Sequence, residues 1–255
     1  MATMAMSWGR SMSWIRIRSR DALADAVALL TLGLALVPVL QPLVGPLPTC
    51  GYDTMFHLWR AVQVNALWDQ GVVYSRWAPD MAQGYGMPLF LFTSAFPPAF
   101  VALLHRAGFD WAVAMNATFG LAWAVGALGM YVLGRTLFGG RKGFAGQVGG
   151  LVTAIAYVYA PFQAYDVFNR GSLWEGVAWA FPPYVLLGLH HWLNRRSSLW
   201  LALGVCAMGA LILSHHLFAF LFGPVLVGWV LAEAIAQRRL STVARGVAFG
   251  VLGLG

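Results

Sequence analysis

Charged residues are scarce in this chain of 255 residues, and acidic residues are the scarcest of them. Only 10% of the residues are charged, 9 acidic against 16 basic, while 60% are hydrophobic. A soluble domain has no use for that much apolar surface, whereas a helix that crosses a bilayer needs about 20 predominantly apolar residues in a row. The composition therefore excludes an ordinary soluble domain and predicts an all-α, polytopic integral membrane protein.

Cysteines and known catalytic motifs are also few. Cys50 lies at the end of an apolar run and Cys206 inside another, which indicates neither a disulfide framework nor a zinc site. The sequence contains no P-loop, no H-E-x-x-H, no G-x-S-x-G and no dinucleotide fingerprint. The net charge of +7 does not predict nucleic-acid binding, because Lys and Arg gather in the cytoplasmic loops of membrane proteins.

Apolar runs follow one another along the chain. The candidate spans are residues 22–44, 88–107, 111–137, 146–160, 173–192, 199–214, 217–236 and an incomplete run, 243–255. The first is too long for the core of a cleaved signal peptide, so we expect a retained signal anchor. The last, about 13 residues at 1.5 Å each, is too short to cross about 30 Å of hydrocarbon. We therefore expect the chain to be the N-terminal part of a longer protein.

The run 88–107 decides the topology. If it spans and the basic N-terminus is inside, ten basic residues fall outside and six inside. If it lies along the outer interface, twelve fall inside and four outside, as the positive-inside rule requires. Its prolines, Pro88, Pro97 and Pro98, also make a poor straight span, because lipid cannot replace the missing backbone donors.

These arguments predict about seven transmembrane helices, the last incomplete, in the inner (plasma) membrane. Residues 1–21 form a basic cytoplasmic tail, and residues 22–255 form the transmembrane domain with an outer loop, 45–110, of juxtamembrane interfacial helices. The outer face then collects most of the chain's chemically useful side chains. These are Asp53, His57, Arg60, Arg76, Asp80, Asp110, Asp166, Arg170, Glu175, His215 and His216.

Asp53, His57 and Arg60 fall on one face of a helix that starts near Asp53, because their spacing is four and then three residues. One interpretation makes Asp53 a general base whose neighbours tune its charge. The other makes it only the N-cap of the helix, with His57 and Arg60 facing water or lipid headgroups.

Other segments on this face carry charges too. Arg76 and Asp80 lie in a Gly- and Pro-rich stretch that is either a structured loop or the source of a second carboxylate. Arg170 either binds a phosphate, whose geometry guanidinium matches, or extends to the lipid headgroups. Ser172 and Glu175 fit a capping box, which accounts for the glutamate without a function.

His215 and His216 end another span. Adjacent helical residues point about 100° apart, so these histidines do not easily chelate one ion together. A divalent-metal site would need carboxylates such as Asp53 or Asp80. The sequence itself requires no metal.

The residues that carry a resemblance to known proteins are Asp53-x-x-x-His57-x-x-Arg60, Trp77-x-Pro79 with Gly84-Tyr85-Gly86-x-Pro88-Leu89-Phe90, Arg170-Gly171-x-x-x-Glu175 and Ser214-His215. From about residue 22 onward, their order and gaps resemble the glycosyltransferase C superfamily. More narrowly, they resemble the bacterial membrane proteins called 6-pyruvoyl-tetrahydropterin synthase-related. No soluble pterin-binding domain is found in the sequence, so pterin chemistry is not expected.

The resemblance implies transfer of a sugar from a polyprenyl-phosphate carrier on the outer leaflet, with an acidic catalytic residue in the first outer loop. Asp53 matches that residue by position, and we expect His57 beside it to be catalytic as well. The candidate substrate-binding residues are Arg60, Arg76, Asp80, Arg170, Glu175 and His215. Of these, Arg170 is assigned to the carrier phosphate on its chemistry alone.

The alternative is a non-catalytic membrane protein, either a lipid-carrier transporter or an assembly subunit. A transporter would place polar groups near the middle of the bilayer, and the predicted span interiors contain almost no ionisable residue. In both cases we expect contact with the lipid bilayer and none with nucleic acid.

Overall fold

The computed structural model describes residues 22–139 and 144–254. Throughout these residues the chain is helix, turn or loop, with one isolated β-bridge between Ala78 and Met87 and no strand. The predicted all-α architecture is therefore confirmed. The tail predicted at residues 1–21, and the basic residues Arg141 and Lys142, lie outside the described residues.

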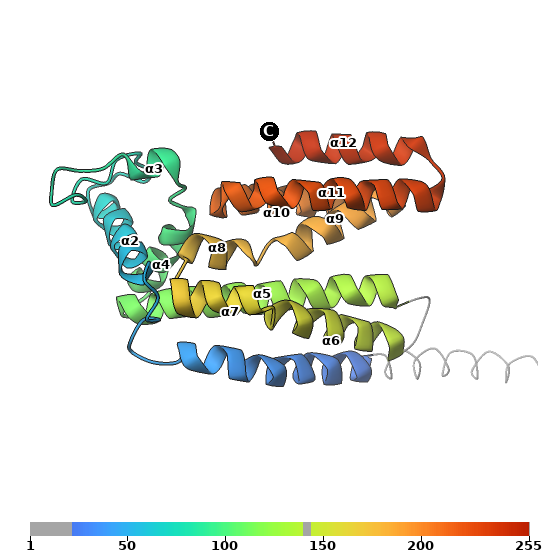
Figure 1. Ribbon diagram of the computed structural model, residues 1–255, viewed down its shortest axis with the longest axis horizontal. Helices are drawn as coiled ribbons and strands as arrows, with labels where there is room; N and C mark the ends of the chain where they lie inside the picture. The colour runs from blue at the N-terminus through green and yellow to red at the C-terminus, as the bar shows by residue number, and fades with distance from the viewer. Residues whose placement is uncertain (1–21, 140–143, 255) are drawn as a thin grey trace, which may run out of the picture.

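Within the described residues, three helices are long and apolar enough to cross a membrane: the N-terminal helix Ala22–Leu43, α5 (Trp111–Phe138) and α11 (His216–Gln237). They lie along the longest axis of the molecule with the shorter apolar helices α6 (Phe144–Val158), α10 (Ser198–Ser214) and α12 (Leu240–Leu254) (Figure 1). The central helix is α5, with 56% of its apolar window buried, against 11% in the N-terminal helix and 6% in α11. Apolar surface exposed on that scale is typical of helices that face lipid.

The span predicted at residues 173–192 is wrong as a single helix. The structure divides it into α8 (Leu173–Ala178) and α9 (Pro182–Arg195), with a turn at residues 179–181. Pro182 and Pro183 are responsible, because proline fits the first turn of a helix but cannot continue one. The backbone carbonyl of Trp179 at this break accepts a hydrogen bond of 2.6 Å from the Tyr157 hydroxyl.

The run 88–107 is also divided, into α3 (Leu89–Phe92) and α4 (Phe96–Arg106). The 11 residues of α4 extend about 16 Å at 1.5 Å per residue, about half the thickness of a bilayer's hydrocarbon core. Helix α4 packs against α2 (Thr54–Asp69) and α5, and its proline pair is buried at the first turn. The structure therefore divides this segment into two short helices, each with a proline at its start, and neither is long enough to cross a membrane alone.

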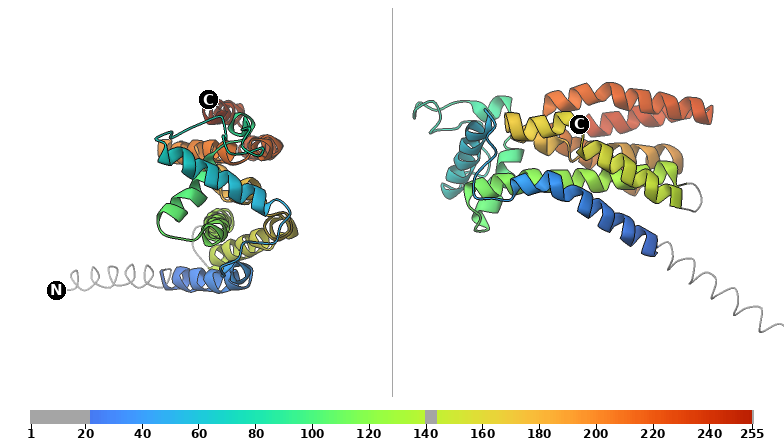
Figure 2. Two further views of the ribbon diagram at one scale, coloured as in Figure 1. Left: turned by 90° about the vertical axis from the view of Figure 1, so that its left-hand side faces the viewer. Right: turned by 60° about the horizontal axis from the view of Figure 1, so that its bottom comes forward.

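The two ends of the helix bundle differ in character. One, which we call the loop end, is covered by α2, α3 and α4, as the left view of Figure 2 shows. The short helix α7 (Pro161–Ala164), the π-helical turn η2 (Tyr165–Arg170) and the start of α8 also lie there (Figure 1). The opposite end, which we call the basic end, carries Arg135, Arg195, Arg196, Arg238 and Arg239.

Candidate functional site

Backbone contacts join the start of α2 to the end of η2 at the loop end. The amide of Tyr52 donates to the Asn169 carbonyl at 3.3 Å, and the amide of Asp53 donates to the Arg170 carbonyl at 2.9 Å. The two backbone segments approach so closely that a side chain on Gly51 would collide with the backbone around Gly171. These hydrogen bonds thereby fix the relative positions of two segments that lie more than a hundred residues apart in the sequence.

Replacing Gly51 with alanine is expected to separate these two segments and lower the free energy of unfolding by about 1–3 kcal/mol, the usual effect of overpacking. The measurement is the thermal unfolding midpoint of the detergent-solubilised protein. Gly45→Ala is the matched control, because no atom lies within 4 Å of a Cβ added there. Equal midpoints for the two variants would contradict the close approach.

Asp53, His57 and Arg60 lie along α2 as their spacing predicts. The Asp53 side chain makes no capping hydrogen bond, although the residue occupies the N-cap position. His57 is buried, and its Nδ1 lies 3.1 Å from Arg60 Nη1. The Arg60 guanidinium lies over the rings of Phe56 and Trp174, at 3.8 and 4.6 Å from their centroids. These contacts hold the Arg60 guanidinium between α2 and α8.

Burial decides the charges of this group. The pKa of His57 is lowered to about 3, first by burial and then by the positive charges of Arg60 and Arg170. The imidazole is therefore neutral near pH 7, and its Nδ1 accepts the hydrogen bond from Arg60. Burial also lowers the pKa of Arg60, to about 10, while Asp53 opposes that shift. Arg60 therefore stays charged, and His57 orients it.

Arg170 lies between two carboxylates. Its Nη1 donates to Asp166 Oδ1 at 2.7 Å and to Glu175 Oε2 at 2.5 Å. The Asp166 side chain is fully buried and also accepts a hydrogen bond of 3.3 Å from Trp179 Nε1. The π-helical turn and the left-handed Gly171, at φ +68°, direct the chain so that Arg170 reaches both acids. The positive charge of Arg170 is thus already neutralised within the protein.

The capping box predicted at Ser172 and Glu175 is wrong. Ser172 is the N-cap of α8, but no side-chain capping hydrogen bond forms there. The Glu175 carboxylate instead binds Arg170, and its other oxygen lies 3.5 Å from His215 Nε2. The charged partner is stronger than a backbone amide, which explains the preference.

The histidine pair differs from its helical expectation. His215 has extended backbone angles, φ −152° and ψ 98°, and caps α11 by accepting from the Phe218 amide at 3.0 Å. The rings of His215 and His216 are 6.1 Å apart and inclined by only 14°. Within residues 22–139 and 144–254, no three His, Cys, Asp or Glu side chains are grouped to hold a metal ion.

The pKa of Asp166 is raised to about 7, by burial first and then by the hydrogen bond and negative charge of Glu175. Protonation of this carboxylate therefore has the opposite effect on stability from protonation of His57. Between pH 7 and 5 the unfolded chain gains a proton on histidine, near pH 6.5, which destabilises the fold. Over the same interval the folded chain gains a proton on Asp166, whose ordinary pKa is 3.8, which stabilises it.

We therefore expect two variants to change the pH dependence of stability in opposite directions from the unsubstituted protein, each by about 1–2 kcal/mol between pH 7 and 5. His57→Gln, which keeps a hydrogen-bond acceptor for Arg60, should lose less stability between pH 7 and pH 5 than the unsubstituted protein does. Asp166→Asn should unfold at a lower temperature at pH 5 than at pH 7. Parallel pH profiles for the two proteins would contradict these pKa shifts.

Asp80 and Arg76 lie apart from the Arg170 contacts. The Asp80 carboxylate accepts from Gln63 Nε2 at 3.0 Å, and its backbone amide donates to Gln63 Oε1 at 2.9 Å. Because Gln63 is buried on α2, this pair attaches the loop to the helix. Arg76 is exposed in the same loop.

The sequence did not single out Trp174 or the pairing role of Asp166. Trp174 places its ring 4.8 Å from that of His57 and contacts Arg60, and it lies on α8, far from α2 in the chain. No local pattern indicates such a contact. The four-residue spacing between Asp166 and Arg170 was the one available signal for their ion pair.

Comparison with known proteins gives a family. The family model described as "6-pyruvoyl-tetrahydropterin synthase related domain; membrane protein" matches residues 93–255. The match includes Arg170, Glu175 and His215 and begins after α2 and the loop that carries Arg76 and Asp80. No curated protein and no solved structure matches the chain. Since more than half of its residues are matched, the chain belongs to the 6-pyruvoyl-tetrahydropterin synthase-related family of membrane proteins.

Proposed function

We propose that this protein is a membrane glycosyltransferase that takes a sugar from a polyprenyl-phosphate-linked donor at the outer face of the inner (plasma) membrane. One observation carries the proposal. Three distant parts of the chain meet at the loop end: α2, η2 with α8, and the start of α11. The backbone amide of Asp53 donates a hydrogen bond to the Arg170 carbonyl, and Glu175 contacts His215. We take residues 22–255 as one transmembrane domain that supports this cluster.

Asp53 is the general base of the proposed reaction. Its backbone is fixed by the Arg170 carbonyl, while its partly exposed carboxylate has no hydrogen-bond partner among the described residues. The other acids of the cluster, Asp166 and Glu175, are occupied by Arg170. A carboxylate that is held in place yet free of donors suits proton abstraction from an acceptor hydroxyl.

Arg60 is a better candidate for the carrier phosphate than Arg170. Arg170 is neutralised by two acids, whereas Arg60 forms no ion pair within the part of the chain that the structure describes. The buried Nε of Arg60 also has no hydrogen-bond partner among the described residues. Guanidinium binds phosphate through two parallel N–H donors, and Nε is one of those available. We assign Arg170, Glu175 and His215 a positioning role: their mutual contacts hold η2, α8 and the start of α11 on the side of the site opposite α2.

The reaction then proceeds as one displacement. The acceptor oxygen attacks the anomeric carbon as the bond from that carbon to the phosphate oxygen breaks. The acceptor's proton passes to Asp53, and polyprenyl phosphate leaves beside Arg60. Exposed aromatic residues around the loop end, including Trp59 and Tyr85, are of the kind that lies at a membrane interface, where a polyprenyl chain would enter.

Transfer in proteoliposomes tests the proposal. The full chain is reconstituted with a labelled polyprenyl-phosphate sugar and a membrane-lipid acceptor extract, and both labelled product and free polyprenyl phosphate are measured. The proposal predicts that the two appear in equal amounts. Movement of the intact donor across the bilayer, without its consumption, would instead identify a lipid-carrier transporter. Donor binding with neither transfer nor movement would identify an assembly subunit.

A further inference from the structure

A pocket of about 450 Å³ opens at the basic end, far from the cluster around Asp53. It lies between the turn that joins α9 to α10 and the turn that joins α11 to α12. Its polar lining consists of Asn194, Arg195, Arg196, Gln237, Arg239 and Arg245. Four of these six side chains carry a positive charge.

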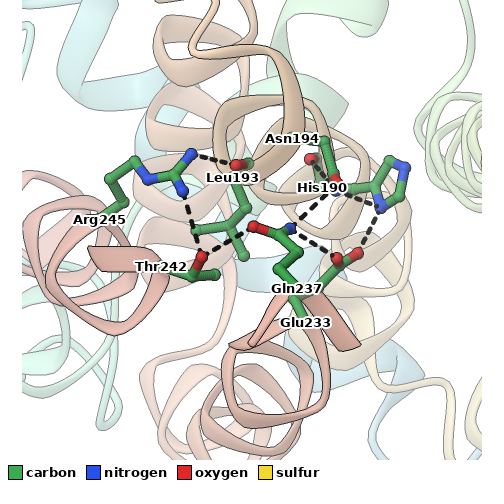
Figure 3. Close-up of polar contacts among 7 residues, drawn as sticks. All are labelled: His190, Leu193, Asn194, Glu233, Gln237, Thr242 and Arg245. Carbon is green, nitrogen blue, oxygen red and sulfur yellow. Dashed lines mark hydrogen bonds and ion pairs between the residues drawn. The ribbon is translucent and has the colours of Figure 1, made fainter. Parts of the chain in front are cut away.

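Lining residues of this pocket and neighbouring side chains form a connected polar network, which Figure 3 shows. Gln237 Nε2 donates to Asn194 Oδ1 at 3.0 Å and to Glu233 Oε2 at 3.1 Å, and its Oε1 accepts from the Thr242 hydroxyl at 2.8 Å. Arg245 donates to the Leu193 carbonyl and to Thr242. These bonds tie α9, α11 and α12 together, so the pocket has a fixed floor.

Among the residues that the structure describes, no acid lines the pocket. Glu233, the acid of this network, is used by Gln237 and by His190 Nδ1, which lies 2.8 Å from its Oε1. Among the described residues, Arg195, Arg196 and Arg239 take part in no ion pair, whereas Arg106, Arg135 and Arg170 each bind an acid. Positive charges gathered around a hollow without a counter-charge repel one another unless an anion enters.

The backbone itself brings the arginines together. Arg196 ends α9 and Arg238 ends α11, and both adopt left-handed angles, φ +53° and +52°. A residue other than glycine seldom adopts that conformation. The left-handed conformation ends each helix within one residue. Arg195 therefore reaches the pocket from the end of α9, and Arg239 from the turn after α11.

We propose that this pocket binds the phosphate headgroup of an anionic phospholipid from the leaflet at the basic end. The pocket lies at the ends of membrane helices, and the exposed apolar side chains of Ile235 and Leu240 flank its lining residues Gln237 and Arg239. A lipid would place its phosphate among the guanidinium groups and its acyl chains along α11 and α12. Basic pockets between membrane helices recognise anionic headgroups in this way.

Lipid titration of the full chain tests the proposal. The purified protein in neutral detergent is titrated with phosphatidylglycerol, with phosphatidylcholine of the same acyl chains, and with glycerol 3-phosphate, and its unfolding midpoint gives the apparent Kd. Phosphatidylglycerol should stabilise the protein more than phosphatidylcholine does. Arg239→Gln should weaken phosphatidylglycerol binding about fivefold, and Arg195→Gln with Arg239→Gln about 25-fold.

Arg106→Gln is the control, because it removes the same charge from an exposed arginine at the loop end. It should leave the Kd for phosphatidylglycerol unchanged. Equal stabilisation by the two phospholipids, or equal effects of Arg239→Gln and Arg106→Gln, would overturn the site. Stabilisation by glycerol 3-phosphate that matches the lipid would overturn the assignment to a lipid and indicate a soluble phosphate ligand.

Discussion

Replacing Asp53 with asparagine is expected to lower the rate of the proposed sugar transfer by about 100- to 10,000-fold, the range for loss of a general base. Asparagine keeps the shape of the side chain and the backbone bond to the Arg170 carbonyl, but its amide cannot take the acceptor's proton. The apparent KM for the donor should change little, because Arg60 rather than Asp53 is assigned to the phosphate. Initial rates in proteoliposomes at several donor concentrations measure both quantities.

Asp110→Asn is the matched control for this experiment. Asp110 is an exposed N-cap residue of α5 near the loop end and, like Asp53, makes no side-chain capping bond. Its replacement removes the same charge from the same end of the molecule and should leave transfer unchanged. Turnover by the Asp53 variant equal to that of the control would remove Asp53 as the base.

Replacing Arg170 with methionine is expected to destabilise the fold by about 3 kcal/mol or more. The change leaves Asp166 and Glu175 facing each other without the guanidinium that joins them, and Asp166 is fully buried. Removing one partner from a buried ion pair typically costs about 3–5 kcal/mol. The partial exposure of Arg170 places the effect at the lower end of this range. Thermal or denaturant unfolding in detergent measures it.

Two further variants test whether unpaired buried charge causes the loss of stability. Adding Asp166→Asn and Glu175→Gln to Arg170→Met should restore much of the lost stability, because the unpaired charges are then absent. Arg106→Met breaks the exposed ion pair with Asp69 and should change stability by less than about 1 kcal/mol. If Arg170→Met were as mild as Arg106→Met, the ion-pair cluster would not contribute to the fold.

The sequence predicted those parts of the fold that composition and proline determine. The apolar runs at 22–44, 111–137 and 217–236 are helices within one or two residues of their expected ends, because uniform apolarity leaves no alternative partner for the backbone. The prolines of 88–107 lie at the starts of α3 and α4, where the apolar run is divided. The same reasoning applied to Pro182 and Pro183 would have divided the run 173–192, where apolarity concealed the break.

The site was predictable only where it follows local spacing. The positions of Asp53, His57 and Arg60 on one helical face follow from their sequence separation. The pairing of Arg170 with Glu175 depends on a π-helical turn and a left-handed glycine, which a helical pattern does not reveal. For that reason the local signature S-x-x-E predicts a cap that does not form. No local pattern indicates the contact that Trp174 makes with α2 from a distant segment.

The sidedness of the site is tested most directly by thiol labelling. Cys50, an exposed cysteine three residues before Asp53, reports on the loop end once Cys206→Ala has removed the other thiol. In right-side-out membrane vesicles, a membrane-impermeant maleimide should label Cys50 without permeabilisation. A second protein carries Ser197→Cys at the basic end, with Cys50→Ala and Cys206→Ala. The same maleimide should label this probe only after permeabilisation. The reverse pattern would place the cluster around Asp53 in the cytoplasm and contradict transfer from an outer-leaflet donor.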